Sequence, residues 1–167
     1  SDKLIFTPWL YGERAPVDDH LVRGGFHNLS LGATRAHMVR AAFEGVAYNV
    51  RWLLGAVEKF IGRKVEAVNM VGGGAKSAVW CQIHADVLNR PIRQVKDPIE
   101  VNARGAALLA SASLGYLGYH EIGTRAPILK TYLPNPDHRK IYDELFAEFA
   151  AIYQNNRKIY ARLNRPR

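Results

Sequence analysis

Three consecutive glycines, Gly72 to Gly74, follow a short apolar run and precede a helical pattern. Glycine has no Cβ, so such a turn can adopt positive φ and approach a ligand closely. The helix that follows directs free N–H groups and the positive end of its dipole toward the same place, which favours an anion. The stretch has neither the spacing of a Walker A loop nor that of GxGxxG. It therefore fits a nucleotide site and a ligand-free strand-to-helix turn equally well.

The residues beside the glycines leave two chemical roles open. Ser77 lies where its hydroxyl could cap the helix or contact a ligand. Lys76 fits a phosphate contact and a solvated surface lysine equally well. Cys81, the single cysteine, falls in the following helix. It can form no internal disulfide and no cysteine-based metal cluster, so we expect a buried structural thiol.

Two adjacent carboxylates, Asp18 and Asp19, lie in an entry region punctuated by proline and glycine. They could bind a cation, but no histidine or glutamate lies at a helical ligand spacing from them. We expect instead that Arg14 or Arg23 pairs with one of them, and we assign no metal site.

The glycine stretch is positioned by an alternation of predicted strands and helices. Two strand–helix units in succession, with short connections, predict a parallel or mixed sheet covered by helices. Apolar periodicity and breakers give helices at 34–61, 77–88, 101–114 and 135–163 and strands at 4–6, 26–31, 65–71 and 92–96, with short structure around 128–133.

Two features of the predicted helices carry structural expectations. Glu44 interrupts the apolar face of the first helix, and a buried carboxylate needs a partner such as Arg40, Arg51 or a backbone amide. Thr34 and Gly62 are suited to cap the two ends of that helix. The small-residue run 105–107 allows the third helix to lie very close to a sheet or another helix.

Composition bounds the classes of protein. At 167 residues and 48% hydrophobic, the chain can form one domain with a core. No apolar run is long enough for a membrane span and no signal-peptide pattern is present, so we expect a soluble, cytoplasmic protein without a membrane partner. The formal charge of +8 suggests nucleic acid, but aromatic residues are not interleaved with the basic ones as base stacking requires. We therefore expect no nucleic-acid partner.

With these pieces in order, the chain resembles the C-terminal domain of the FGGY carbohydrate kinases, and within that family the xylulokinase branch. The similarity is collinear over nearly the whole chain. It is carried by residues 8–16, Asp19, Arg23-Gly24, 35–37, 40–47, 72–77, Trp80, Gln82, Ala85, Asp86, Ala103, 105–107 and Asn135-Pro136.

The resemblance implies an α/β, actin-like (ribonuclease-H-like) ATPase half-domain with a mixed sheet, flanking helices and a long C-terminal helix. It implies transfer of the γ-phosphoryl group of ATP, with Mg²⁺, to a sugar hydroxyl. Gly73 and Gly74 match the family's adenosine motif, and Gly72, Ala75 and Ser77 are their surroundings in the expected nucleotide site. The general base and most sugar contacts of the family lie in an N-terminal domain, so we expect no catalytic residue here.

By the same resemblance, residues 1–167 are a nucleotide-binding domain that lacks its N-terminal sugar-binding partner. The chain begins without methionine, which fits a piece of a larger protein. Alone it should be inactive, and an exposed apolar face could promote homo-oligomers. D-xylulose is the expected sugar; ribulose, gluconate and glycerol are alternatives, and a non-catalytic basic binding module is the alternative of a different class.

Overall fold

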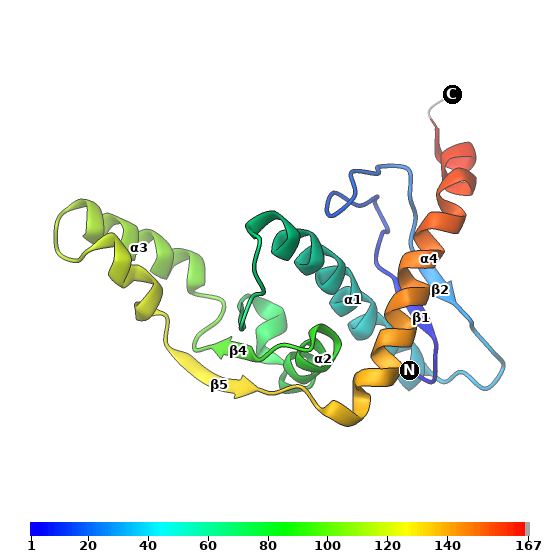
Figure 1. Ribbon diagram of the computed structural model, residues 1–167, viewed down its shortest axis with the longest axis horizontal. Helices are drawn as coiled ribbons and strands as arrows, with labels where there is room; N and C mark the ends of the chain where they lie inside the picture. The colour runs from blue at the N-terminus through cyan, green and yellow to red at the C-terminus, as the bar shows by residue number, and fades with distance from the viewer. Residues whose placement is uncertain (166–167) are drawn as a thin grey trace.

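The computed structural model describes residues 1–165, which form two small sheets and four α-helices (Figure 1). A two-stranded antiparallel sheet pairs β1 (Ile5–Thr7) with β2 (Gly25–His27). A three-stranded sheet has the order β3 (Val68–Met70), β4 (Ile92–Val95), β5 (Ile128–Tyr132). β3 runs parallel to β4 and β5 antiparallel to it, which confirms the mixed sheet.

Helix α1 (Arg35–Ile61) has the bounds that its end signals predict. The Thr34 hydroxyl accepts a hydrogen bond from the His37 amide at 3.3 Å, and the His37 ring accepts one from the Thr34 amide at 3.4 Å. Gly62 follows the helix with φ of 70°, the left-handed conformation in which a glycine ends a helix without steric cost. Thr34 and Gly62 are thus confirmed as caps.

The remaining helices follow the predicted order with small shifts. α2 (Ala78–Leu88) covers one face of the three-stranded sheet, and α3 (Val101–Ser113) follows β4. β5 confirms the short structure expected around 128–133, and the 3₁₀ helix η2 (Tyr119–Arg125) precedes it. The last helix, α4 (Arg139–Asn164), begins later than predicted because residues Pro136–His138 form a separate 3₁₀ turn, η3.

The core lies where α1, α2, α4 and β1 meet. Trp9 and Phe149 are fully buried there with ring centroids 5.1 Å apart, and Tyr48 lies 5.6 Å from Phe149. Gly45 lets β1 lie directly on α1, because a Cβ at this position would come within 2.1 Å of the Phe6 carbonyl oxygen. A close approach between backbone and helix is therefore built into the sequence at one residue.

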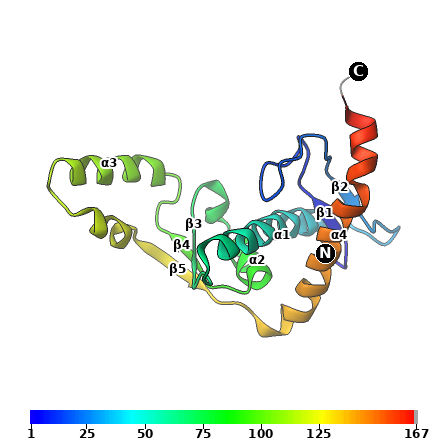
Figure 2. The same cartoon turned by 45° about the horizontal axis from the view of Figure 1, so that its top comes forward.

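Helix α3 does not use the close approach that its small residues allow. It projects at one end of the molecule and packs mainly on η2 (Figures 1 and 2). Gly105, Ala106 and Ala107 are exposed, and a Cβ on Gly105 would meet nothing within 4 Å. Small side chains permit a close approach but do not supply the surface that is approached, so the run 105–107 stays uncovered among the described residues.

The entry region contradicts the expected arginine pairing. One Asp19 carboxylate oxygen accepts hydrogen bonds from the Leu21 and Val22 amides at 2.9 and 3.2 Å, and the other from the Tyr153 hydroxyl at 3.2 Å. Asp18 lies 3.3 Å from the His20 ring. Arg23 donates instead to the His20 and Val22 carbonyl oxygens at 2.9 and 2.8 Å, so the Asp19 carboxylate caps its own loop.

Over residues 1–165, no helix is both long enough and apolar enough to cross a membrane. The same residues contain no group of three or more histidine, cysteine or acidic side chains that could hold a metal ion.

Candidate functional site

The glycine stretch joins β3 to α2 through a tight, regular connection. Gly72 has φ of 78° and ψ of −171°, a conformation that disfavours other residues. Gly73–Lys76 then form the one-turn 3₁₀ helix η1, so the glycines are more ordered than an open turn. The Ser77 hydroxyl accepts a hydrogen bond from the Trp80 amide at 3.2 Å, which confirms Ser77 as the cap of α2.

The three glycines meet three different surroundings. Gly72 is required by its backbone conformation, although space lies beside it. A Cβ on Gly74 would lie 2.7 Å from the Trp80 ring, so this glycine makes room for an indole. A Cβ on Gly73 would meet nothing within 4 Å, and the residue is exposed. Gly73 is thus the glycine that leaves backbone accessible to a ligand.

The turn is fixed from its inner side. The Gln94 amide donates a 2.6 Å hydrogen bond to the Ala75 carbonyl oxygen, and Ala75 is fully buried. The Trp80 indole stacks on Phe43 with centroids 5.0 Å apart and donates to the Phe43 carbonyl oxygen at 3.1 Å. Side chains from both the sheet and the helices therefore hold η1 in place.

Cys81 belongs to this inner support. Its thiol is fully buried, lies 3.7 Å from the Ala75 carbonyl oxygen, and burial raises its pKa. A thiol with a raised pKa carries little of the reactive thiolate. The expectation of a buried structural cysteine is confirmed.

The outer side of η1 borders a hollow of about 220 Å³ lined by Lys76 and residues 97–100. The Gly72 amide donates a 2.7 Å hydrogen bond to the Pro98 carbonyl oxygen, which joins the turn to the β4–α3 connection. Sites for small molecules usually measure about 300–1,000 Å³, so this hollow suits a part of a nucleotide. Of the predicted residues, Gly73 is exposed and Gly72 joins the turn to Pro98, whereas Gly74, Ala75 and Ser77 support the turn through Trp80, Gln94 and the helix cap.

The family model for the C-terminal domain of the FGGY family of carbohydrate kinases matches residues 1–114. This chain belongs to that family. Its fold is accordingly the actin-like ATPase fold, as the resemblance implied.

Relatives of this FGGY chain are named as kinases of different substrates. The xylulose kinase of Staphylococcus epidermidis is 33% identical over 165 residues, 98% of this chain and 33% of the relative. The gluconokinase of Bacillus subtilis is 32% identical over 150 residues, with 89% and 29% covered. The glycerol kinase of Pasteurella multocida is 36% identical over 135 residues, with 80% and 27% covered. The chain therefore spans about a third of the length of these relatives.

Solved structures agree with this placement. The ligand-bound xylulose kinase of Lactobacillus acidophilus superposes with a TM-score of 0.84 at 33% identity, covering 97% of this chain and 33% of that one. A gluconate kinase from the same organism gives 0.83 at the same identity and coverage.

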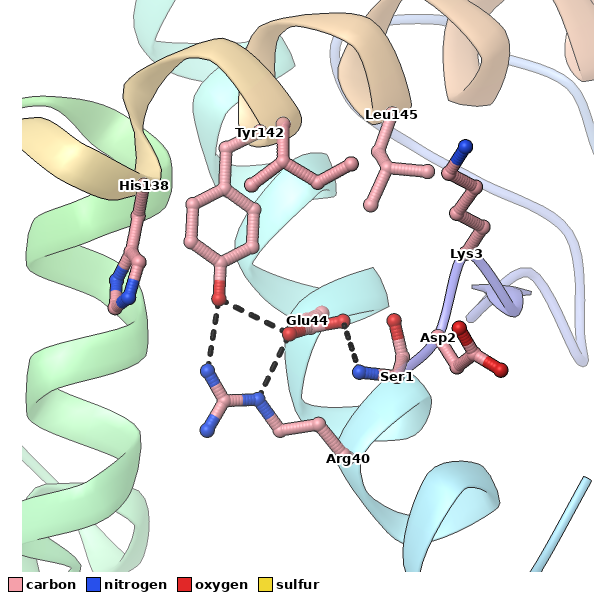
Figure 3. A pocket seen from close by; sticks show the side chains of 9 residues that line it. Ser1, Asp2, Lys3, Arg40, Glu44, His138, Tyr142 and Leu145 are labelled. Carbon is pink, nitrogen blue, oxygen red and sulfur yellow. Dashed lines mark hydrogen bonds and ion pairs between the residues drawn. The ribbon is translucent and has the colours of Figure 1, made fainter.

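A second cluster in this FGGY chain surrounds Glu44, which is nearly fully buried (Figure 3). One Glu44 oxygen accepts hydrogen bonds from Arg40 at 2.7 Å, confirming that partner, and from the Tyr142 hydroxyl at 3.0 Å. The Ser1 amine lies 3.8 Å from the other oxygen. Burial and the Glu44 charge raise the pKa of Tyr142 to about 12. The cluster holds α1 against α4 and offers no activated nucleophile.

Only one of these contacts joins residues that are close in the sequence. The spacing of four between Arg40 and Glu44 predicted their pairing. Tyr142 lies 98 residues from Glu44, and no local signal could associate the two. Arg51, the other predicted partner of Glu44, instead contacts Asp143 at 2.5 Å.

Asp86 plays a similar joining role that its sequence position did not reveal. It is buried in α2 and accepts hydrogen bonds from the Gln82 amide at 2.7 Å and the Asn135 backbone N–H at 2.9 Å. Its other oxygen lies 2.9 Å from the His138 ring. Gln82 and Asp86 thus connect the helix after the glycine turn to the start of α4.

Proposed function

We propose that this chain is the nucleotide-binding domain of an ATP-dependent sugar kinase and that η1 contacts the adenosine part of the nucleotide. The observation that carries the proposal is the one-sided anchoring of η1. Its inner face is fixed by Trp80 and Gln94, while the backbone at Gly73 is exposed and Lys76, the last residue of η1, lines a hollow. Such pre-positioning is what phosphoryl transfer demands of a protein, because the reaction depends on placement and charge neutralisation.

The residues present fit a nucleotide better than a metal ion on its own. Gly73 offers exposed backbone for the adenosine part. Lys76 lines the hollow beside the carboxylates of Asp97 and Glu100, so the hollow suits the uncharged part of a nucleotide better than its phosphates. The described residues offer no cluster of three metal ligands, so Mg²⁺ would arrive on the phosphates of ATP, as is usual for this ion. The nucleotide would supply the γ-phosphoryl group and this chain its binding and orientation.

The rest of the reaction belongs to a part of the protein that this chain does not supply. Residues 1–167 correspond to about a third of the relatives' length. We propose that an N-terminal domain provides the general base and the sugar contacts, that the reaction takes place in the cytoplasm, and that the isolated chain is inactive. Phosphorylation of a sugar by the chain alone, above a control without protein, would contradict this division.

D-xylulose is the proposed sugar, because the xylulose kinase relative and the xylulose kinase structure cover nearly all of this chain. Gluconate and glycerol are the alternatives named by other relatives. Comparing kcat/KM for the three acceptors in the protein that contains both domains decides among them. A higher value for gluconate or glycerol would replace D-xylulose.

A substitution of Gly73 tests the adenosine contact without disturbing the turn. A methyl group on Gly73 meets no protein atom, so Gly73→Ala should leave the melting temperature unchanged or raise it slightly. If a nucleotide lies against this backbone, the methyl group should weaken Mg-ATP binding about tenfold or more, as measured by calorimetric titration.

Gly123→Ala is the matched control, because Gly123 also lies in a 3₁₀ helix with nothing within 4 Å of its Cβ position. It should bind Mg-ATP like the unaltered chain. Equal binding by Gly73→Ala and the unaltered chain would contradict the contact, as would the absence of saturable binding to the folded chain. Gly74 is unsuitable for this test because a Cβ there would collide with Trp80.

A further inference from the structure

A basic cleft lies where the end of α1, the end of α2 and the start of α4 come together. Its volume is about 620 Å³, and its apolar lining includes Trp52, Leu88 and Phe146. Five cationic side chains line it: Arg51, Lys59, Lys64, Arg90 and Arg139. This hollow and its five cationic residues form the basic cleft.

Two carboxylates, Glu58 and Asp143, form ion pairs with four of these five cations. Glu58 accepts hydrogen bonds from Lys64 at 2.8 Å and from Arg90 at 3.1 Å. Asp143 is shared in the same way by Arg51, at 2.5 Å, and by Arg139. Lys59 has no ion-pair partner among residues 1–165. Five positive charges against two negative ones leave an excess of three on one hollow.

Helix ends explain only some of this charge. Lys59, Lys64 and Arg90 lie near the C-terminal ends of α1 and α2, where a helix dipole favours cations. Arg139 lies in the first turn of α4, where the dipole disfavours a cation. Arg51 lies within α1 with its side chain only 17% exposed and its guanidinium 4.2 Å from the centre of the Phe146 ring.

The like charges act on one another. Burial and the neighbouring charges of Arg51 and Arg90 lower the pKa of Arg139, and burial lowers the pKa of Arg51. Arginines held this close without enough counter-charge cost free energy, which an external anion would recover. One guanidinium group can donate two parallel hydrogen bonds to two oxygens of a phosphate. Arginine is therefore the side chain best suited to bind a phosphate anion.

We propose that the basic cleft binds a small, multiply charged phosphate compound such as a diphosphate. Its volume falls in the usual range for sites of small molecules, about 300–1,000 Å³. The five cations surround a bounded hollow with an apolar lining, whereas a nucleic-acid surface would present cations along a track with exposed aromatic rings. The cleft lies at the end of α2 opposite to η1, about 16 Å along an 11-residue helix. The proposal therefore does not depend on the nucleotide site.

Inorganic pyrophosphate is the probe, titrated into residues 1–167 by calorimetry at a fixed ionic strength. The variant is R90Q/R139Q, in which Glu58 keeps Lys64 and Asp143 keeps Arg51, so no carboxylate is left unpaired. We expect saturable binding to the unaltered chain and a loss of about tenfold or more in the variant. The melting temperature of the variant confirms that it folds.

The control removes the same charge elsewhere. K158Q/R162Q takes two exposed cations from the far end of α4 and should bind pyrophosphate within about twofold of the unaltered chain. An equal loss in both double variants would overturn the proposal, because it would indicate general attraction. So would a loss in Gly73→Ala with none in R90Q/R139Q, which would place pyrophosphate at η1. Failure of the folded, unaltered chain to bind pyrophosphate, or binding of single-stranded DNA in its place, would also overturn it.

Discussion

The two ends of the molecule bury their apolar side chains to very different degrees. At the end formed by α1, α2, α4 and β1, Trp9 and Phe149 are fully buried and Tyr153 is 7% exposed. At the other end, formed by α3, η2 and β5, Leu109 is 54% exposed and Tyr116 is 82% exposed. The first of these is the packed end and the second is the open end. Both ends are ordered as regular secondary structure (Figure 2).

This difference separates local from tertiary causes of structure. α3 has helix-forming residues and a helical period, yet it packs mainly on η2. α1 is held by two caps, by the approach of β1 at Gly45 and by Glu44. The glycine turn lies between the two ends, with its anchored side facing the packed one through Trp80 and Phe43. Rigidity of the candidate site therefore comes from the packed end.

The largest expected effect comes from emptying the packed core. Phe149→Ala removes a fully buried ring that contacts Trp9, Tyr48 and Trp52, and should lower the free energy of unfolding by about 3–5 kcal/mol. Leu109→Ala, at the open end, should cost less than about 1 kcal/mol because half of the side chain already meets solvent. Urea unfolding measures both. Comparable losses would mean that the two ends are packed alike in solution.

An intermediate effect concerns two carboxylates, one at each end. Hydrogen bonds from Lys64, which has the larger effect, and from the Val65 amide lower the pKa of the buried Glu58 from 4.5 to about 2. Because the folded pKa is depressed, its contribution to stability is present above about pH 4.5 and is lost as the pH falls toward 2. We expect Glu58→Gln to flatten the fall in melting temperature over that range.

Glu121, at the open end, provides the comparison. Hydrogen bonds from the Gly118 amide, which has the larger effect, and from Arg125 lower the pKa of Glu121 too, but the Glu121 carboxylate is solvated. Glu121→Gln should therefore leave the acid limb of stability close to that of the unaltered chain, because water screens the interaction. If Glu121→Gln flattened the curve as much as Glu58→Gln, burial would not be the source of the difference.

The features that the sequence predicted correctly are those with local causes, and the features that it missed depend on tertiary contacts. Thr34, Ser77 and Gly62 are recognisable because a helix cap depends on a few neighbouring residues, and the helix periods placed all four helices. Tyr142 beside Glu44, and Gln94 beneath Ala75, depend on chain segments 98 and 19 residues apart, which no local pattern encodes. The glycine motif predicted a site, but it does not distinguish Gly73, which is open to solvent, from Gly74, which makes room for Trp80, because that difference depends on the tertiary packing.

The smallest expected effect is a gain at the open end. Gly105 lies in α3, is exposed, and has nothing within 4 Å of its Cβ position. Gly105→Ala should raise the free energy of unfolding by about 0.5–1 kcal/mol, because alanine is the better helix former. At the packed end, Gly45→Ala should lower it by about 2 kcal/mol or more, since its Cβ would collide with the Phe6 carbonyl.

Thermal unfolding at several protein concentrations checks this pair of glycine variants. A gain for Gly105→Ala that does not depend on concentration agrees with an α3 face that is uncovered in solution. A loss that grows with concentration would contradict it, because the small residues of α3 would then be covered by a second copy of the chain, and an added methyl group would disturb that contact. The outcome therefore decides whether the open end of this chain stays open when copies of it meet.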